Sequence, residues 1–193
     1  MEELALHMLD LAENSIAAGA RRVDIRVTED PASDRLVLEV RDDGSGMPEE
    51  VARRAADPFF TTRQTRPVGL GLALLDQAAR MAGGGLRIES EPGVGTTVTA
   101  EFQLSHPDRQ PLGDVAATLL ALAAGHPEIE FSYEHRGADF STRFDTAEFR
   151  RSLGDVAPHS PAAISALRRA LAEALRALHR DSRQEVSHGS GNH

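Results

Sequence analysis

The stretch DDGSGMP, residues 42–48, decides the fold of this chain when it is taken together with three other short strings. It follows an apolar strand and ends in a proline of the kind that begins a helix. Working outward, DLAENSIAAGA precedes it at residues 10–20, and GLGL and EPGVGTT follow it at 69–72 and 91–97. Each string alone also fits a plain turn or a solvated helix face, but the four in this order are improbable by chance.

The spacing of apolar residues around these strings predicts both helices and strands. Helical spacing favours helices over residues 2–18, 48–56 and 70–82. Alternation of apolar and polar residues favours two hairpins, the first with strands at 23–27 and 36–40 and the second over 86–104. We therefore expect an α+β unit over residues 1–104.

The remainder of the chain predicts a small C-terminal α+β appendage over residues 105–185. It is expected to hold a helix near 112–124, strands carrying Phe131 and Phe144, and a short helix with a capping pattern at Asp145. A last amphipathic helix begins at Ser160 and Pro161 and carries its apolar side at Ile164, Leu167, Leu171, Leu175 and Leu178. Residues 186–193 are expected to be a disordered tail.

Composition excludes several kinds of chemistry. The chain of 193 residues has no cysteine, and all 21 of its basic residues are arginine. A lysine-containing phosphate loop, a lysine Schiff base, a disulfide and a thiolate metal site are therefore impossible. The formal net charge of -9 disfavours nonspecific binding to nucleic acid or to an anionic membrane, so a small molecule or a protein is the expected partner.

The beginning of the chain does not resemble a targeting segment. Its first ten residues, MEELALHMLD, are acidic where a signal peptide is basic, and the longest apolar stretch is too short to span a bilayer. These features predict a cytoplasmic protein.

The first expected helix presents candidate site residues on one strip. His7, Asp10 and Asn14 fall within about 60° of one another on the helical wheel, beside the apolar seam. An amide oxygen of Asn14 can bind Mg²⁺ without adding negative charge beside a triphosphate, since Mg²⁺ favours few protein ligands together with phosphates and waters. A solvated helix face remains the alternative for this strip.

Asp42 ends an apolar strand and is followed by Gly44 and Gly46, which allow a planar ring to approach the backbone. Its carboxylate can accept a hydrogen bond from the amino group of adenine, whereas guanine offers an acceptor at that position. Further along, Gly69 and Gly71 precede a helix whose free N–H groups can bind phosphate. A simple strand-to-helix turn is the alternative for the first of these patterns.

Two other segments complete the candidate site. The long polar segment DPFFTTRQTRPVG, residues 57–69, is typical of a mobile lid and offers Arg63 and Arg66 to neutralise phosphate. In the last string, a hydroxyl of Thr96 or Thr97 can support the contact of Asp42 with adenine. A solvated loop and a plain hairpin turn are the corresponding alternatives.

The four strings resemble the asparagine box and the three successive glycine boxes of the GHKL superfamily. This superfamily includes the ATP-binding domains of histidine kinases, the mismatch-repair ATPase, gyrase and the heat-shock chaperone. The resemblance covers nearly all of residues 4–104 and implies a Bergerat fold, a two-layer α/β sandwich with a mixed sheet. It also implies ATP and Mg²⁺ as cofactors, with Mg²⁺ on Asn14, adenine on Asp42, and the nucleotide further lined by Gly44, Gly46, Met47, Arg63, Gly69, Leu70, Gly71, Leu72 and Thr97.

The resemblance leaves the reaction open, because the chain departs from the hydrolytic members. Asp10 occupies the slot of the glutamate that orients water in those members, and it is one methylene shorter. The lysine that mismatch-repair and gyrase types use on the γ-phosphate has no counterpart in this chain. A complete self-phosphorylating histidine kinase is not expected either, since only nine residues precede Asp10.

We therefore expect an ATP–Mg²⁺-binding signalling protein that transfers phosphoryl from ATP to a partner protein, as stand-alone anti-sigma kinases of this superfamily do. Phosphoryl transfer requires mainly positioning and charge neutralisation. The alternatives are a nucleotide-gated binding module with little hydrolysis and a slow ATPase switch of the mismatch-repair type. The partner is unidentified in each case, and an oligomer is compatible with all three.

Overall fold

The computed structural model describes residues 3–57, 70–154, 157 and 160–177. Its helices and strands follow one another along the chain as α1 (Leu4–Ala17), β1 (Arg22–Asp30), β2 (Arg35–Asp42), α2 (Glu49–Arg54), α3 (Leu70–Met81), β3 (Gly85–Glu91), β4 (Gly95–Gln103), α4 (Val115–Gly125), β5 (Glu130–Arg136), β6 (Ser141–Asp145), α5 (Thr146–Ser152), α6 (Pro161–Ala174) and a 3₁₀ turn at Leu175–Ala177.

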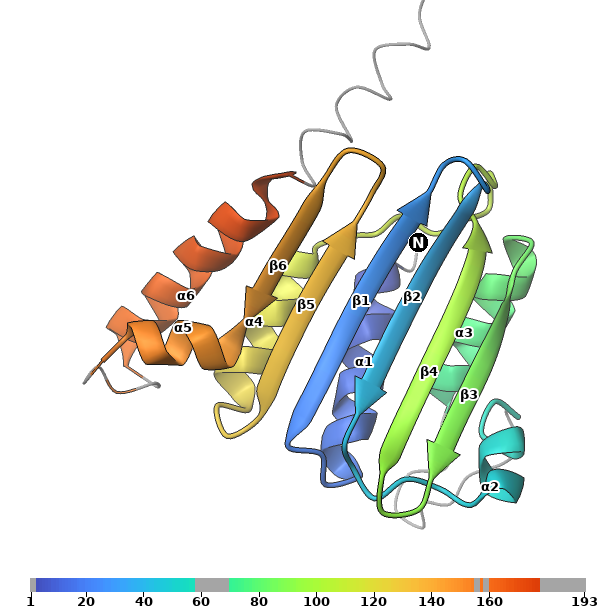
Figure 1. The fold of residues 1–193 in the computed structure, drawn as a ribbon, viewed down its shortest axis with the longest axis horizontal. Coiled ribbons are helices and arrows are strands. Elements are labelled where there is room, and N and C mark those ends of the chain that lie inside the picture. The colour runs from blue at the N-terminus through green and yellow to red at the C-terminus, as the bar shows by residue number, and fades with distance from the viewer. Residues whose placement is uncertain (1–2, 58–69, 155–156, 158–159, 178–193) are drawn as a thin grey trace, which may run out of the picture.

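The six strands form one mixed sheet in the order β3-β4-β2-β1-β5-β6. Every neighbouring pair is antiparallel except β1 and β5, which run parallel. Helices α1, α3 and α4 cover one face of this sheet, and the opposite face is open (Figure 1). The expected two-layer α+β sandwich with a mixed sheet is confirmed.

The part of the core nearest the centre of the sheet lies between α1 and the two central strands, and the same buried cluster continues to α3, α4 and α6. Val23, Ile25 and Val27 of β1 are buried because alternate side chains of a strand point to the same face. The same alternation buries β2, and Leu4, Met8 and Leu11 of α1 cover both strands at helical spacing. Each fully buried aliphatic side chain of this kind stabilises the fold by roughly 1.5–3 kcal/mol.

The C-terminal region continues the same sheet instead of forming a sheet of its own. Strand β5 pairs along the free edge of β1, with Val23 opposite Phe131 and Ile25 opposite Tyr133. The segment between the two regions also caps α1, because the carbonyl oxygens of Pro111 and Leu112 accept the N–H groups of Leu4 and Ala5 at 3.0 and 2.9 Å. The structure therefore joins the expected appendage closely to residues 1–104, and the domain boundary itself stays a prediction.

Two capping signals of the C-terminal region are confirmed. The Asp145 carboxylate accepts the N–H groups of Ala147 and Glu148 at the beginning of α5. The Ser160 hydroxyl accepts the N–H of Ala163 at the beginning of α6. The expected apolar side of α6 is buried at Leu167 and Leu171 and continues to Leu175, whereas Leu178 and the expected tail at 186–193 lie outside the described residues.

The open face of the sheet carries paired charges. Arg26 lies between Glu39 at 2.8 Å and Glu134 at 3.3 Å, and Arg22 contacts Asp24 at 3.0 Å. Pairing of this kind between exposed groups adds little stability but keeps the face hydrated. No helix in the described part of the chain combines the length and apolar character needed to cross a membrane.

A buried polar chain links β1 to β5. His135 is 1% exposed. Its Nε2 lies 3.0 Å from the Glu29 carboxylate, and its Nδ1 lies 3.2 Å from the Tyr133 hydroxyl. The hydrogen bond from His135 holds the pKa of Glu29 below its usual value, so this carboxylate is charged at neutral pH. Removing the imidazole would leave the buried Tyr133 hydroxyl and the partly exposed Glu29 carboxylate without this partner.

Replacing His135 with alanine is expected to lower the free energy of unfolding by about 2–4 kcal/mol, from the lost hydrogen bonds and the cavity. The matched control is His126→Ala, because His126 is partly exposed and contacts Glu13 at the surface, and it should cost under about 1 kcal/mol. Urea unfolding of both variants measures the difference, and equal losses would contradict the prediction.

The same contact gives a pH dependence with a definite sign. Because the pKa of Glu29 is lowered in the folded state, its contribution to stability is present above its ordinary pKa of 4.5. That contribution is lost as the pH falls through the depressed value. In His135→Ala this acid-dependent loss of stability should be smaller than in the unmodified protein.

Candidate nucleotide-binding site

Asp42, at the end of β2, has a carboxylate held in one orientation by three donors. Its Oδ1 accepts the N–H of Gly44 at 2.9 Å and the N–H of Thr96 at 3.3 Å. Its Oδ2 accepts the hydroxyl of Ser15, from α1, at 2.7 Å. Asp42 shares the helix-covered face of β2 with the buried Leu38 and Val40, and it is half-buried. The structure thus presents a fixed, partly accessible acceptor between α1 and the sheet.

The neighbouring Asp43 has a different role. Its Oδ1 accepts the backbone N–H groups of Arg21 and Arg22 at 2.7 and 2.8 Å. These bonds tie the loop after β2 to the beginning of β1. Of the two consecutive aspartates, the second is therefore used to hold the backbone, and the first remains available for a ligand.

The loop after Asp42 packs closely because two of its residues are glycines. A side chain at Gly44 would meet the Ala18 carbonyl oxygen at 3.0 Å. Gly46 has a φ of +63°, and a Cβ there would lie 1.9 Å from the carbonyl oxygen of Glu91. The loop therefore lies directly against the turn between β3 and β4, which carries the last glycine string.

A row of hydroxyl groups continues from Asp42 across the sheet. Thr96 is the register partner of Asp42, and Ser90 is the register partner of Thr96. The Ser90 and Thr96 hydroxyl oxygens are 2.8 Å apart, and Ser90 Oγ also accepts the N–H of Met47 at 2.8 Å. Thr97, the threonine that the resemblance implies, is paired with Arg41 and lies on the opposite, open face. The structure brings Thr96 to Asp42 and does not bring Thr97 there.

Asp10 and Asn14 lie one helical turn apart on α1. The Asn14 amide nitrogen donates to Asp10 Oδ2 over 3.4 Å, a long contact. Gly71, in the first turn of α3, lies so close that a Cβ there would be 1.5 Å from the same carboxylate oxygen. The beginning of α3 therefore approaches α1 at the two polar residues. His7, expected on the same strip, is buried and contacts Gln110 at 3.0 Å.

The structure describes only some of the remaining predicted residues. Arg63 and Gly69 lie outside the described residues, as does most of the expected lid. Leu70 begins α3, and Leu72 packs against the core. Ser15 and Ser90 were not predicted, and the residues alone did not separate Thr96 from Thr97. Their hydroxyl groups carry no spacing signal, and only strand register and helix position reveal them.

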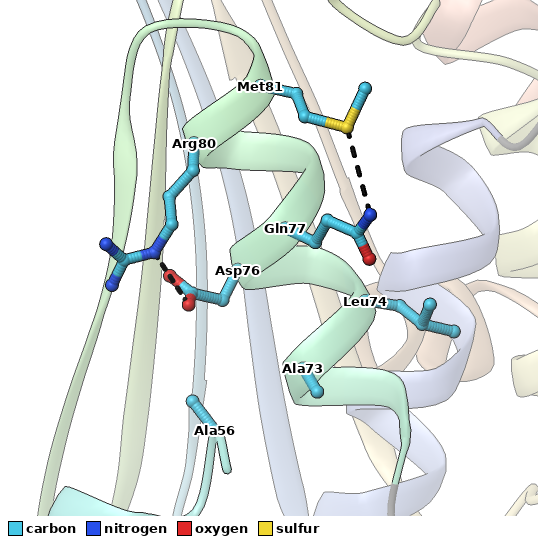
Figure 2. Close-up of a pocket in the computed structure, with 7 residues that line it drawn as sticks. All are labelled: Ala56, Ala73, Leu74, Asp76, Gln77, Arg80 and Met81. Atoms are coloured by element: carbon cyan, nitrogen blue, oxygen red, sulfur yellow. Dashed lines mark hydrogen bonds and ion pairs between the residues drawn. The ribbon is translucent and has the colours of Figure 1, made fainter. Parts of the chain in front are cut away.

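A cavity of ≈ 380 Å³ lies elsewhere, beside α3. It is lined by Ala56, Ala73, Leu74, Asp76, Gln77, Arg80 and Met81. Figure 2 shows Asp76 and Arg80 pointing to one side of α3, joined to each other, with Leu74, Gln77 and Met81 on the other side. None of the residues predicted to bind a nucleotide lines it, so the cluster around Asp42 is the stronger candidate site.

A family model decides what kind of domain this geometry belongs to. The model described as "Histidine kinase-, DNA gyrase B-, and HSP90-like ATPase" matches residues 2–106, more than half of the chain. The chain belongs to this ATPase family. The matched range contains all four glycine and asparagine strings, and it includes every described residue of the cluster around Asp42. ATP is the ligand that membership of the ATPase family implies.

Curated relatives of this ATPase-family chain include proteins that are named as kinases. It is 34% identical over 119 residues to the Non-motile and phage-resistance protein of Caulobacter vibrioides, covering 57% of this chain and 14% of that protein. It is 38% identical over 85 residues to Sensor kinase CckA of Brucella abortus, covering 44% and 9%. It is 31% identical over 109 residues to Sporulation kinase A of Bacillus subtilis, covering 56% and 17%. The chain thus spans a small part of each relative's length.

A solved structure shows the same fold at low sequence identity. The N-terminal domain of a DNA repair protein superposes with a TM-score of 0.54 and 16% identity, over 74% of this chain and 52% of that one. This likeness extends beyond the 54% or so of the chain that the family model matches, and at this identity it shows the fold alone.

Proposed function

We propose that the chain binds ATP with Mg²⁺ at the Asp42 cluster and acts as a signalling protein kinase that passes the γ-phosphoryl group to a partner protein. The observation that carries the proposal is the Asp42 carboxylate, fixed by Ser15, Gly44 and Thr96, with Asn14 and Asp10 further along the same helix, α1. The acceptor for the base, at the end of β2, thus contacts the helix that carries the polar groups for the triphosphate. The kinase names among the relatives support the choice of reaction.

The base is proposed to bind through the amino group of adenine. An ionised carboxylate only accepts hydrogen bonds, so Asp42 matches a base that offers N–H groups at that position. Gly44 supports this assignment, because a side chain there would also fall 3.0 Å from Asp42 Oδ1 and crowd the carboxylate. The guanine carbonyl oxygen would instead face the carboxylate and be repelled.

Asn14 fits the role of the Mg²⁺ ligand. Its amide nitrogen is engaged by Asp10, which leaves the amide oxygen as the atom offered to a cation. Within the described ranges, no group of three or more histidines or carboxylates could hold a metal ion alone. A site that offers few protein ligands suits Mg²⁺, because Mg²⁺ keeps phosphate and water ligands. Bound there, Mg²⁺ would neutralise charge on the triphosphate oxygens.

Asp10 is proposed as the base of the transfer step. In that step the bond between the γ-phosphorus and the β–γ bridging oxygen breaks, a bond forms from the partner's acceptor atom to phosphorus, and ADP leaves. The acceptor's proton passes to Asp10 or to solvent. The close approach of Gly71 supports the assignment, because it brings the first turn of α3 beside Asp10, and the N–H groups that begin a helix can bind phosphate.

The same contacts favour a second candidate, slow hydrolysis that switches a binding module. Asp10 is near Asn14 without any partner chain, so water can replace the acceptor side chain. The carboxylate is one methylene shorter than a glutamate, and a base is effective only when it is well placed. Hydrolysis is therefore expected to be slow.

The test is incubation of the purified chain with γ-labelled ATP and Mg²⁺, with and without cell extract, following free phosphate and labelled protein. A labelled extract band is expected, and Asn14→Ala should abolish it. Asp10→Asn should lower the rate by about 10²–10⁴-fold while ATP still binds. The matched control is Glu13→Gln, since Glu13 contacts His126 at 3.2 Å and should leave the band unchanged.

Other results would redirect the assignment. Free phosphate without labelled protein would replace the kinase with the slow hydrolytic switch. ATP binding with neither product would leave a nucleotide-gated module. Absence of ATP binding in calorimetry would overturn the site itself.

A further inference from the structure

We propose that Ser90 is a specificity-determining residue, which positions the hydroxyl of Thr96 to donate to the ring nitrogen beside the amino group of adenine. The inference rests on the proposed binding of ATP at Asp42. A threonine of the last string is already expected to support the contact with adenine, and the inference names the residue that orients its hydroxyl. It assigns a function to a serine on β3 that no glycine or asparagine string contains.

The hydrogen bonds of Ser90 join separate parts of the site. Its Oγ accepts the N–H of Met47, at the end of the loop that follows Asp42, at 2.8 Å. It lies 3.1 Å from the carbonyl oxygen of Gly95 and 2.8 Å from the hydroxyl of Thr96. Ser90 therefore links the first glycine loop to the last glycine turn, and Thr96 is the register partner of Asp42.

The number of protons in this network determines what Thr96 can offer. Ser90 has one hydroxyl proton, and it can point to Thr96 Oγ1 or to the Gly95 carbonyl oxygen. When it points to Thr96, the threonine keeps its own proton for a ligand. When it points to Gly95, the threonine donates to Ser90 and presents only lone pairs. The shorter distance, 2.8 against 3.1 Å, favours the first arrangement.

The first arrangement complements one edge of adenine. The Asp42 carboxylate accepts, and the Thr96 hydroxyl beside it donates, so the pair matches a base edge with an N–H next to an acceptor nitrogen. Guanine presents a carbonyl oxygen at the first position. Ser90 acts on this match through Thr96 and does not itself need to touch the base.

The experiment measures Kd for ATP, 1-deaza-ATP and 7-deaza-ATP. The first analogue lacks N1 and the second lacks N7, the acceptor nitrogens on the two sides of the amino group. In the unmodified chain, one analogue should bind about 5-fold more weakly than ATP, the worth of one hydrogen bond. In Ser90→Ala, Thr96 keeps its proton but loses the partner that orients its hydroxyl, so ATP should bind more weakly and the penalty for that analogue should fall below about 2-fold. A purely structural role would weaken all three ligands equally.

Two further variants complete the design. Ser90→Thr keeps the hydroxyl on a strand that tolerates threonine and should restore the penalty. Ser132→Ala is the matched control, because it removes a strand hydroxyl that donates to Asp24 on the open face, and it should leave every Kd unchanged.

The outcomes separate the two proposals. If the unmodified chain binds ATP but neither analogue pays a penalty, or Ser90→Ala leaves the penalty as it was, the role of Ser90 is refuted and ATP binding stands. If the unmodified chain does not bind ATP, the proposed function fails.

Discussion

Replacing Asp42 with asparagine is expected to raise the Kd for ATP by at least about 100-fold while the fold remains intact. The effect is large because asparagine removes a charged acceptor and places its own N–H opposite the amino group of adenine. The change is isosteric, so the surrounding backbone has no reason to move.

The contacts of Asp42 determine how the asparagine would be oriented. Two backbone N–H groups, from Gly44 and Thr96, point at Oδ1 and require an oxygen there. The amide nitrogen must then occupy the place of Oδ2, beside Ser15. Ser15 can accept that N–H and turn its own proton to the Leu11 carbonyl oxygen, which lies 3.1 Å away. The amide nitrogen would therefore face the amino group of adenine.

Calorimetric titration with ATP and with GTP measures this prediction. The preference for ATP over GTP should narrow, because an N–H at this place suits the guanine carbonyl oxygen. The control is Asp43→Asn, whose amide oxygen can still accept the N–H groups of Arg21 and Arg22, and which should bind ATP normally. Unchanged ATP affinity in Asp42→Asn would remove the base assignment.

Replacing Gly46 with alanine is expected to lower the free energy of unfolding by about 3 kcal/mol or more and to abolish ATP binding. The residue has a left-handed φ of +63°, and its Cβ would lie 1.9 Å from a backbone oxygen of Glu91. A backbone oxygen cannot rotate away as a side chain can. The loop after Asp42 would have to separate from the β3–β4 turn.

Gly93 provides the matched control for this prediction. It also has a left-handed φ, of +78°, but a Cβ there meets nothing within 4 Å. Gly93→Ala should therefore cost only the conformational part, roughly 1 kcal/mol. Urea unfolding of the two variants isolates the steric part, and a Gly46→Ala loss no larger than that of Gly93→Ala would contradict the close packing of the two loops.

Local sequence patterns predicted the individual helices and strands, but they did not predict which distant strands pair. Alternation of apolar residues is visible within a strand, so both hairpins and the cap at Asp145 followed from the sequence. The pairing of β5 with β1 joins Val23 to Phe131, and no local pattern reports which strand a distant segment will contact. The C-terminal region was therefore expected as an appendage, although it extends the main sheet.

Local sequence likewise predicted only part of the candidate site. Asp42, Gly44 and Gly46 are recognisable because a ligand-binding loop needs these residue types in sequence order. The choice between Thr96 and Thr97 depends on register, since a shift of one residue moves a side chain to the other face. The hydroxyl of Ser15 acts through a contact between a helix and a strand, which only the folded chain creates.

The parallel pairing of β1 and β5 also sets an order of events during synthesis. β1 is made early, yet its second hydrogen-bonding edge is covered only by residues 130–136. Until these residues leave the ribosome, the growing sheet exposes a row of unpaired backbone groups that other chains can bind. We therefore expect the nascent ATPase domain to be prone to aggregation until β5 pairs with β1, so that the C-terminal strands protect this edge as well as completing the sheet.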